Sequence, residues 1–244
     1  MNTAVTLATA RRILTQLRHD HRTVALMIVL PSVLLILLRY MFNSELAFSR
    51  AAPALLGVFP FSIMFIVTSI TTLRERTTTT LERLMTMPIG KLDLLLGYAL
   101  AFGALAVVQV TVAMTVSLTW LGLDIAGSAV LLGVVAVLDA LLGMALGLFA
   151  SAFARTEFQA VQFMPAVVMP QVLLCGLFIT RDAMTPVLRW VSDVLPLSYA
   201  VDALTQVTMS STVDATLLRN LLVVGGCAVL ALVLGAVTLP RRTP

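Results

Sequence analysis

Charged side chains are scarce in this chain of 244 residues: Asp, Glu, Lys and Arg together make up 11% of it, whereas 59% is hydrophobic. Soluble domains carry about 25% charged residues. The shortage of charge, together with hydrophobic runs long enough to cross a bilayer, excludes a soluble domain and predicts an all-α polytopic membrane protein. We expect residues 1–244 to form one transmembrane domain.

Cysteine and histidine are also rare, with two of each. Cys175 and Cys227 both lie in apolar runs, which indicates two buried thiols and excludes a disulfide framework. His19 and His21 adjoin a basic segment and have no acidic partner in a plausible cleft. We therefore expect no metal site.

Motifs for nucleotide chemistry are missing as well. The only lysine, Lys91, is followed by Leu92, and Met85 stands where the first glycine of a P-loop is required. No serine or cysteine nucleophile has a recognisable base. The chain is therefore expected to be neither an ATPase nor another enzyme, and to bind no cofactor of its own.

Six hydrophobic segments are predicted to span the membrane. Before them, residues 5–21 combine basic positions such as Arg11 with an apolar side that includes Ile13 and Leu17, which is typical of an interfacial amphipathic helix. A targeting peptide is the alternative, but the spans that follow favour a retained segment. The six spans cover about residues 24–42, 53–73, 94–120, 129–153, 163–179 and 221–239.

The segment 74–93 holds seven charged residues between two of these spans, and so much charge cannot lie in hydrocarbon. Thr79 and Glu82 have the spacing of a capping box, and Pro88 would end the short helix that begins there. This pattern predicts an amphipathic helix at the membrane surface that forms a binding site. The alternative is a charged loop that only fixes the topology. The apolar side of the helix would comprise Leu81, Leu84 and Met85.

Basic residues are distributed unequally between the two sides of the membrane. Eleven of the sixteen Lys and Arg residues fall on the side that holds both termini and the segment 74–93. This excess predicts that both termini are cytoplasmic and that the protein is a multi-pass protein of the cell membrane. The net charge of +4 is scattered between apolar segments, which favours membrane lipid over nucleic acid as its partner.

Residues 180–216, which follow the fifth predicted span, are too polar for a span and too many for a simple turn. Two apolar stripes meet at Pro196, and Trp190 and Tyr199 suit the headgroup region. We expect two short helices that dip into the outer leaflet. An ordinary helical hairpin on the outer surface is the alternative.

Asp139 is the one acidic residue near the middle of a predicted span, where an ionised carboxylate is costly. It could couple transport to a proton or cation, as in a secondary transporter. It could instead make an interhelical hydrogen bond, for instance to Gln109 or Thr111. The absence of an internal repeat favours the hydrogen bond.

Two blocks of sequence resemble the permeases of ABC type 2 exporters, including those of the daunorubicin-resistance type. The first block contains Arg74-Glu75-Arg76, Thr80-Leu81-Glu82-Arg83-Leu84 and Pro88, although Thr79 stands where that family usually has Gly. The second contains Gly176-Leu177-Phe178 and Leu195-Pro196-Leu197-Ser198-Tyr199, although Ile179 and Thr180 stand where a Pro commonly follows. The blocks come in the expected order.

The resemblance implies a permease subunit of an ATP-driven exporter. Two copies of an ABC ATPase subunit would bind ATP and Mg, and a second copy of this chain or a related permease would complete the translocation path. The residues of the external gate would be Trp190, Pro196 and Tyr199. The residues that couple to the ATPase would be Arg74, Glu75, Arg76, Thr79, Leu81, Glu82, Arg83, Leu84, Met85 and Pro88.

The second and fifth spans supply a candidate substrate path with an adaptable apolar lining and few polar anchors. Such a lining suits amphiphilic drugs or lipid-like compounds, although these side chains could merely face lipid. A non-transporting membrane scaffold is a third hypothesis for the chain. The candidate path comprises Phe61, Met64, Phe65, Thr68, Gln162, Phe163, Met164 and Gln171.

Overall fold

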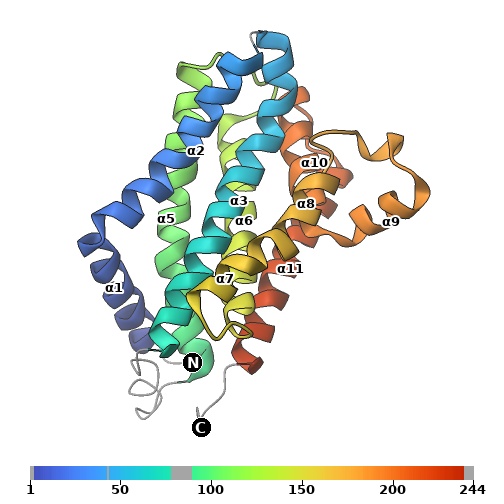
Figure 1. Ribbon diagram of the computed structural model, residues 1–244. Coiled ribbons are helices and arrows are strands. Elements are labelled where there is room, and N and C mark those ends of the chain that lie inside the picture. The colour runs from blue at the N-terminus through green and yellow to red at the C-terminus, as the bar shows by residue number, and fades with distance from the viewer. Residues whose placement is uncertain (1–2, 43, 78–89, 239–244) are drawn as a thin grey trace.

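The computed structural model describes residues 3–42, 44–77 and 90–238, and every regular element in them is a helix (Figure 1). Five of these helices are long and apolar enough to cross a membrane. The predicted all-α polytopic membrane fold is therefore confirmed. The five are α2 (His21–Phe42), α3 (Glu45–Thr77), α5 (Lys91–Thr119), α6 (Ala129–Ser151) and α11 (Ala215–Thr238).

The predicted span 163–179 is not among the five. Its place is taken by three helical pieces in direct succession: α7 (Glu157–Phe163), the π-helix η1 (Met164–Val168) and α8 (Met169–Leu174). Pro165 and Pro170 lack an N–H group and clash with the preceding turn, which explains why the α-helix is interrupted here. The predicted total of six spans is consequently not confirmed.

The N-terminal helix α1 (Thr3–His19) agrees in extent with the predicted segment 5–21. Asp20 separates it from α2, and its carboxylate accepts hydrogen bonds from Thr23 N at 3.2 Å and Thr23 Oγ1 at 2.6 Å. These bonds lower the pKa of Asp20. Ile13 and Leu17 are buried, and α1 packs along the first part of α5. The predicted apolar side of this helix therefore faces the protein.

The centre of the bundle is the long contact between α3 and α6 (Figure 1). Small residues of α6 allow the two backbones to approach closely, as is common between membrane helices. Thr68 Oγ1 of α3 also donates to the carbonyl oxygen of Met144 in α6 at 3.2 Å. The α3–α6 pair therefore forms the packed core on which the other elements rest.

Between α8 and α11 the chain forms η2 (Arg181–Ala183), α9 (Pro186–Val194) and α10 (Pro196–Met209). Leu195 has extended backbone angles between the last two helices, so α9 and α10 are separate elements, as predicted. In Figure 1, α9 stands away from the bundle. By contrast, α10 packs against α3, α6 and α11.

Candidate functional site

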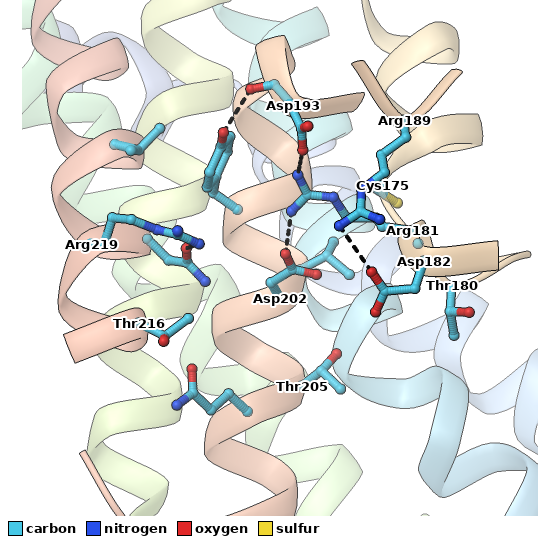
Figure 2. A pocket seen from close by; sticks show the side chains of 16 residues that line it. Cys175, Thr180, Arg181, Asp182, Arg189, Asp193, Asp202, Thr205, Thr216 and Arg219 are labelled. Atoms are coloured by element: carbon cyan, nitrogen blue, oxygen red, sulfur yellow. Dashed lines mark hydrogen bonds and ion pairs between the residues drawn. The ribbon is translucent and has the colours of Figure 1, made fainter. Parts of the chain in front are cut away.

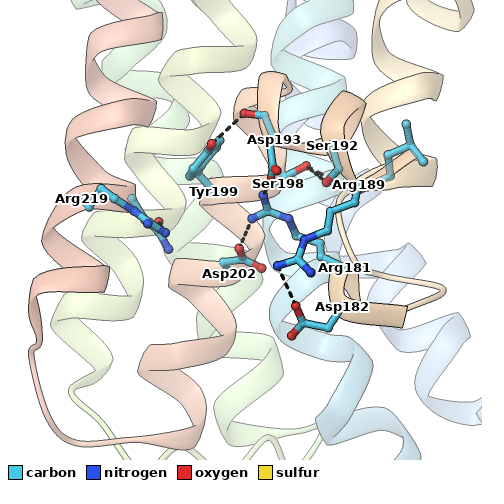
Figure 3. A network of polar contacts seen from close by, with 11 residues as sticks. Arg181, Asp182, Arg189, Ser192, Asp193, Ser198, Tyr199, Asp202 and Arg219 are labelled. Carbon is cyan, nitrogen blue, oxygen red and sulfur yellow. Dashed lines mark hydrogen bonds and ion pairs between the residues drawn. The ribbon is translucent and has the colours of Figure 1, made fainter. Parts of the chain in front are cut away.

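Arg181 is the centre of a polar network that joins three elements (Figure 3). From η2, its guanidinium donates to the carboxylate of Asp193 in α9 and to that of Asp202 in α10. The guanidinium carbon also lies 5.2 Å from the centroid of the Tyr199 ring. Charge-assisted bonds of this kind are among the strongest hydrogen bonds in proteins. One side chain thus ties α9 and α10 together.

Hydroxyl groups attach the same pair of helices to the end of α8. Ser192 Oγ donates to the carbonyl oxygen of Leu174 at 2.8 Å, and lies 3.0 Å from Ser198 Oγ. Tyr199 donates from its hydroxyl group to the carbonyl oxygen of Asp193 at 2.7 Å. Because these bonds cross between elements, moving α9 requires several of them to break together.

The ion pairs that Arg181 makes and the ion pair between Arg189 and Asp182 differ in burial. Burial raises the pKa of Asp202, while the charge of Arg181 and its hydrogen bond act in the opposite direction. The second pair, Arg189 with Asp182 at 3.1 Å, has both side chains exposed. An exposed pair contributes little to stability. Of these ion pairs, those of Arg181 therefore contribute more to holding the region than the pair of Arg189.

A cavity of about 820 Å³ lies beside the network, between α10, α11 and the turn that follows α8. Figure 2 shows the side chain of Arg219 directed from α11 toward Asp202 on α10. Arg219 donates to Asn220 Oδ1 at 3.4 Å, and it has no carboxylate within ion-pair distance in the described part of the chain. The cavity has the size of a ligand site and carries charges of both signs.

Asp139 lies where α3, α6 and α10 meet. A methyl group added to Gly57 of α3 would stand 3.0 Å from Asp139 Oδ2 and 2.8 Å from Leu204 Cδ1 of α10. The carboxyl group is fully buried, and neither oxygen has a hydrogen-bond partner among the residues that the structure describes. Burying a polar group without such a partner is costly.

The predicted hydrogen bond from Asp139 to Gln109 or Thr111 is therefore wrong. Both polar side-chain atoms of Gln109 are themselves unbonded within the described ranges. Thr111 donates to the carbonyl oxygen of Val107, in its own helix, at 2.7 Å. Asp139 faces α3 and α10 rather than the polar residues of α5. The rotation of α6 about its axis decides this, and it cannot be read from the position of Asp139 in the sequence.

At the end of α3, three consecutive residues bond to four different helices. Arg74 makes a two-point contact with Glu157 of α7, at 3.0 and 3.2 Å. Glu75 is buried and accepts hydrogen bonds from Arg12 of α1, at 3.0 Å, and from the hydroxyl group of Tyr98 in α5. Arg76 donates to the last residue of α6, through the carbonyl oxygen of Ser151.

Three residues of the predicted coupling site belong to this cluster, and the coupling role itself stays a prediction. Arg74, Glu75 and Arg76 lie together at the point where α3 enters the segment 78–89. The other predicted coupling residues lie outside the described residues. They are Thr79, Leu81, Glu82, Arg83, Leu84, Met85 and Pro88.

The residues of the predicted substrate path are dispersed. Phe61, Met64, Phe65 and Thr68 are fully buried in the described chain, on the helix that packs against α6, and Gln171 is also buried. Gln162 is exposed, whereas Phe163 and Met164 are half-buried. None of the eight lines the cavity beside Arg219. The substrate path remains a prediction.

The three predicted gate residues belong to the network region. Trp190 is 69% exposed on α9, Pro196 is the first residue of α10, and Tyr199 bonds to α9. The sequence pattern did not single out four residues of these polar contacts: Arg12, Glu157, Arg181 and Asp202. All four residues are charged, in a chain with few charged residues. Only the fold shows which of these charges contact each other.

The apolar helices define the chain as a polytopic helical membrane protein. The family model for the ABC-2 type transporter matches residues 3–209, and the chain belongs to that family.

Individual relatives are more distant. Over 206 residues the chain is 28% identical to the Escherichia coli (strain K12) protein named "Probable multidrug ABC transporter permease YbhS", an alignment that covers 84% of this chain and 55% of the relative. Over 158 residues it is 25% identical to "ABC transporter G family member 20" of Dictyostelium discoideum, covering 65% of this chain and 22% of the relative. The chain thus spans about half the length of the first relative.

Proposed function

We propose that this chain is the permease subunit of an ATP-driven exporter and that a separate subunit hydrolyses ATP. Membership of the ABC-2 family supports this assignment, as does the multidrug permease name of the Escherichia coli relative. ATP and Mg would bind to the partner ATPase. In the proposed assembly, two ATPase subunits serve two permeases, the second being another copy of this chain or a related one.

The observation that carries the proposal is the set of bonds made by Arg74, Glu75 and Arg76. These residues immediately precede the predicted coupling helix Thr79–Pro88, and they connect α3 to α1, α5, α6 and α7. In the proposed mechanism, ATP binding moves the ATPase and with it the coupling helix. Because the three residues link the helices, this displacement moves several helices together rather than bending one loop.

The continuous helix α3 provides a path to the proposed gate. It extends from the cluster at Glu75 to Gly57, where it contacts Leu204 of α10. A shift of α3 along α6 would therefore change the surface against which α10 packs. Arg181 links α9 to α10, so α9 would move with it. The predicted gate residues Trp190, Pro196 and Tyr199 would move with this pair and open the outer side.

The proposed substrates are amphiphilic drugs or lipid-like compounds. A cavity of about 490 Å³ lies between α1, α3 and α7, near the proposed coupling site. Val67 and Ile70 give it an apolar wall, while Asp20 and Glu157 are charged. An apolar wall beside polar groups matches an amphiphile that arrives from the membrane surface.

Ion-coupled transport through Asp139 is the second candidate, and one observation favours it. The carboxyl group is fully buried without a hydrogen-bond partner in the described residues, although such groups in membranes usually have one or serve a function. Against it, the family of this chain points to ATP as the energy source.

Transport by inverted membrane vesicles tests the proposal. The chain is co-expressed with a candidate ABC ATPase subunit, and uptake of a panel of fluorescent amphiphiles is followed with and without ATP. We expect ATP-dependent uptake that is lost when the catalytic glutamate of the ATPase is replaced by glutamine. Uptake driven by a proton gradient in the absence of ATP would support the Asp139 candidate instead.

The proposed orientation has a separate test. Single cysteines replace Lys91 and Asp193 in a chain that lacks Cys175 and Cys227, and intact cells are treated with a membrane-impermeant thiol reagent. The positive-inside distribution predicts labelling at position 193 and none at position 91. Labelling at position 91 and none at position 193 would show that the proposed orientation is the wrong way round.

A further inference from the structure

We propose that the charged cavity between α10 and α11 binds the zwitterionic phosphodiester headgroup of a membrane lipid, of the phosphoethanolamine type. The inference does not depend on whether the chain transports anything. It follows from the charges that line the cavity (Figure 2), from the one cation among them without an ion-pair partner in the described residues, and from the exposed apolar side chains of α9.

The cavity lining is electrically balanced. It contains three guanidinium groups and three carboxylates, so its net charge does not favour a simple anion or a simple cation. The charges are arranged as separate positive and negative positions rather than as a field of one sign. A ligand that carries both a phosphate and an ammonium group complements such a lining.

Arg219 is the position for the phosphate. Arg189 is paired with Asp182, and Arg181 is bonded to two carboxylates. Within the described residues, the side-chain bond found for Arg219 is a long one, 3.4 Å, to the amide oxygen of Asn220. A guanidinium group presents a planar fork of donors that matches two phosphate oxygens. In the described chain, the bond to Asn220 leaves most donors of the Arg219 guanidinium available for a ligand.

Asp202 is the position for the ammonium group. It shares the single guanidinium of Arg181 with Asp193, so two carboxylates are neutralised by one cation. Asp202 also lies close enough to Arg219 to be influenced by its charge. A primary ammonium group can donate hydrogen bonds to the carboxylate, which a fully methylated ammonium cannot do.

A lipid is the source that fits the surroundings of the cavity. On α9, from which Arg189 and Asp193 reach the cavity lining, Val187, Trp190 and Val194 are each 65–72% exposed. Acyl chains would cover this apolar surface while the headgroup enters the cavity, and tryptophan is typical of the headgroup region. A small soluble phosphodiester would leave it uncovered.

Native mass spectrometry of the full-length protein in detergent tests the inference. Phosphatidylethanolamine, phosphatidylcholine and phosphatidylglycerol with identical acyl chains are titrated separately. We expect phosphatidylethanolamine to bind most tightly. Arg219→Gln should weaken its binding about tenfold, because a charge-assisted bond to the phosphate is lost. Arg50→Gln is the matched control: the same substitution at an exposed arginine outside the cavity, with binding as in wild type.

Three results would overturn the inference. The first is equal binding of the three lipids, and the second is equal binding by Arg219→Gln and the control. The third concerns the source: if soluble glycerophosphoethanolamine saturates the protein at the concentration that suffices for the lipid, the ligand is a free phosphodiester and the lipid assignment fails. Arg219→Lys keeps the charge and should retain more binding than Arg219→Gln, which separates charge recognition from loss of folding.

Discussion

Gly143 of α6 lies directly against the carbonyl oxygen of Phe61 in α3, so closely that a methyl group at position 143 would overlap it. Backbone atoms cannot rotate away as a side chain can. The contact therefore fixes how near the two central helices approach, and it gives a direct test of the packed core.

We predict that Gly143→Ala destabilises the fold by about 1–3 kcal/mol, the usual cost of overpacking. Gly226→Ala in α11 is the control, since nothing lies within 4 Å of a methyl group added there. Thermal unfolding in detergent, followed by circular dichroism, compares the two. Equal midpoints for both variants would show that α3 and α6 are not packed this closely.

Asp139→Asn should fold as wild type does and retain ATP-dependent transport. The substitution keeps the shape of a side chain that has no hydrogen-bond partner to lose among the described residues. The measurements are monodispersity in detergent and uptake of an amphiphile by vesicles. A folded variant without transport would assign Asp139 a role in ion coupling.

Arg181→Gln should expose Cys175. This thiol is fully buried in the described structure and also lines the cavity beside the network that Arg181 holds together. Each 1.4 kcal/mol lost from the closed state raises the open population about tenfold. In a background with Cys227→Ala, the rate of thiol labelling measures that population.

Arg189→Gln is the control for this experiment, because it removes only an exposed ion pair. Its labelling rate should match that of the parent. If Arg181→Gln labels no faster than this control, the network does not hold α9 and α10 in place.

The link between Arg74 and Glu157 should depend on pH and salt. The hydrogen bond from Arg74 lowers the pKa of Glu157 below its ordinary value of 4.5. The carboxylate therefore contributes stability above that value, and the contribution is lost as the pH falls through the lowered pKa. Because both side chains are about half exposed, the effect is small and salt weakens it.

The measurement is the difference in unfolding midpoint between wild type and Glu157→Gln. We expect a difference at pH 7 that shrinks with added salt and is lost as the pH falls through the lowered pKa of Glu157. A difference that stays constant from pH 7 to pH 3 would mean that the ion pair does not contribute.

Composition and the periodic pattern of apolar and basic residues predicted the membrane class, the separate N-terminal helix and five helices that the structure shows to be long and apolar enough to cross a membrane. Those features depend on local composition and period, which the sequence displays. The fifth predicted span, 163–179, corresponds to three helical pieces that cover residues 157–174, with a π-helix at Pro165. A proline in the sequence indicates that an α-helix is interrupted, but it does not indicate that the interruption is a π-helix.

The polar contacts were harder to predict because they depend on helix rotation and on partners distant in sequence. Glu75 is 63 residues from Arg12, and Arg181 is 21 residues from Asp202. Asp139 could be recognised as unusual from its position in a span. Its actual neighbours, Gly57 and Leu204, follow only from the packing of three helices.

The central claim is that the segment Thr79–Pro88 receives the ATPase, and co-purification tests it most directly. Leu84→Ala removes a proposed anchor and should weaken association by about 1–3 kcal/mol, while Glu82→Lys adds repulsion or leaves a partner cation unpaired. We expect both variants to purify normally but to lose the ATPase and its substrate-stimulated hydrolysis. If both retain the ATPase and couple hydrolysis to transport as wild type does, the segment only sets topology and the account is contradicted.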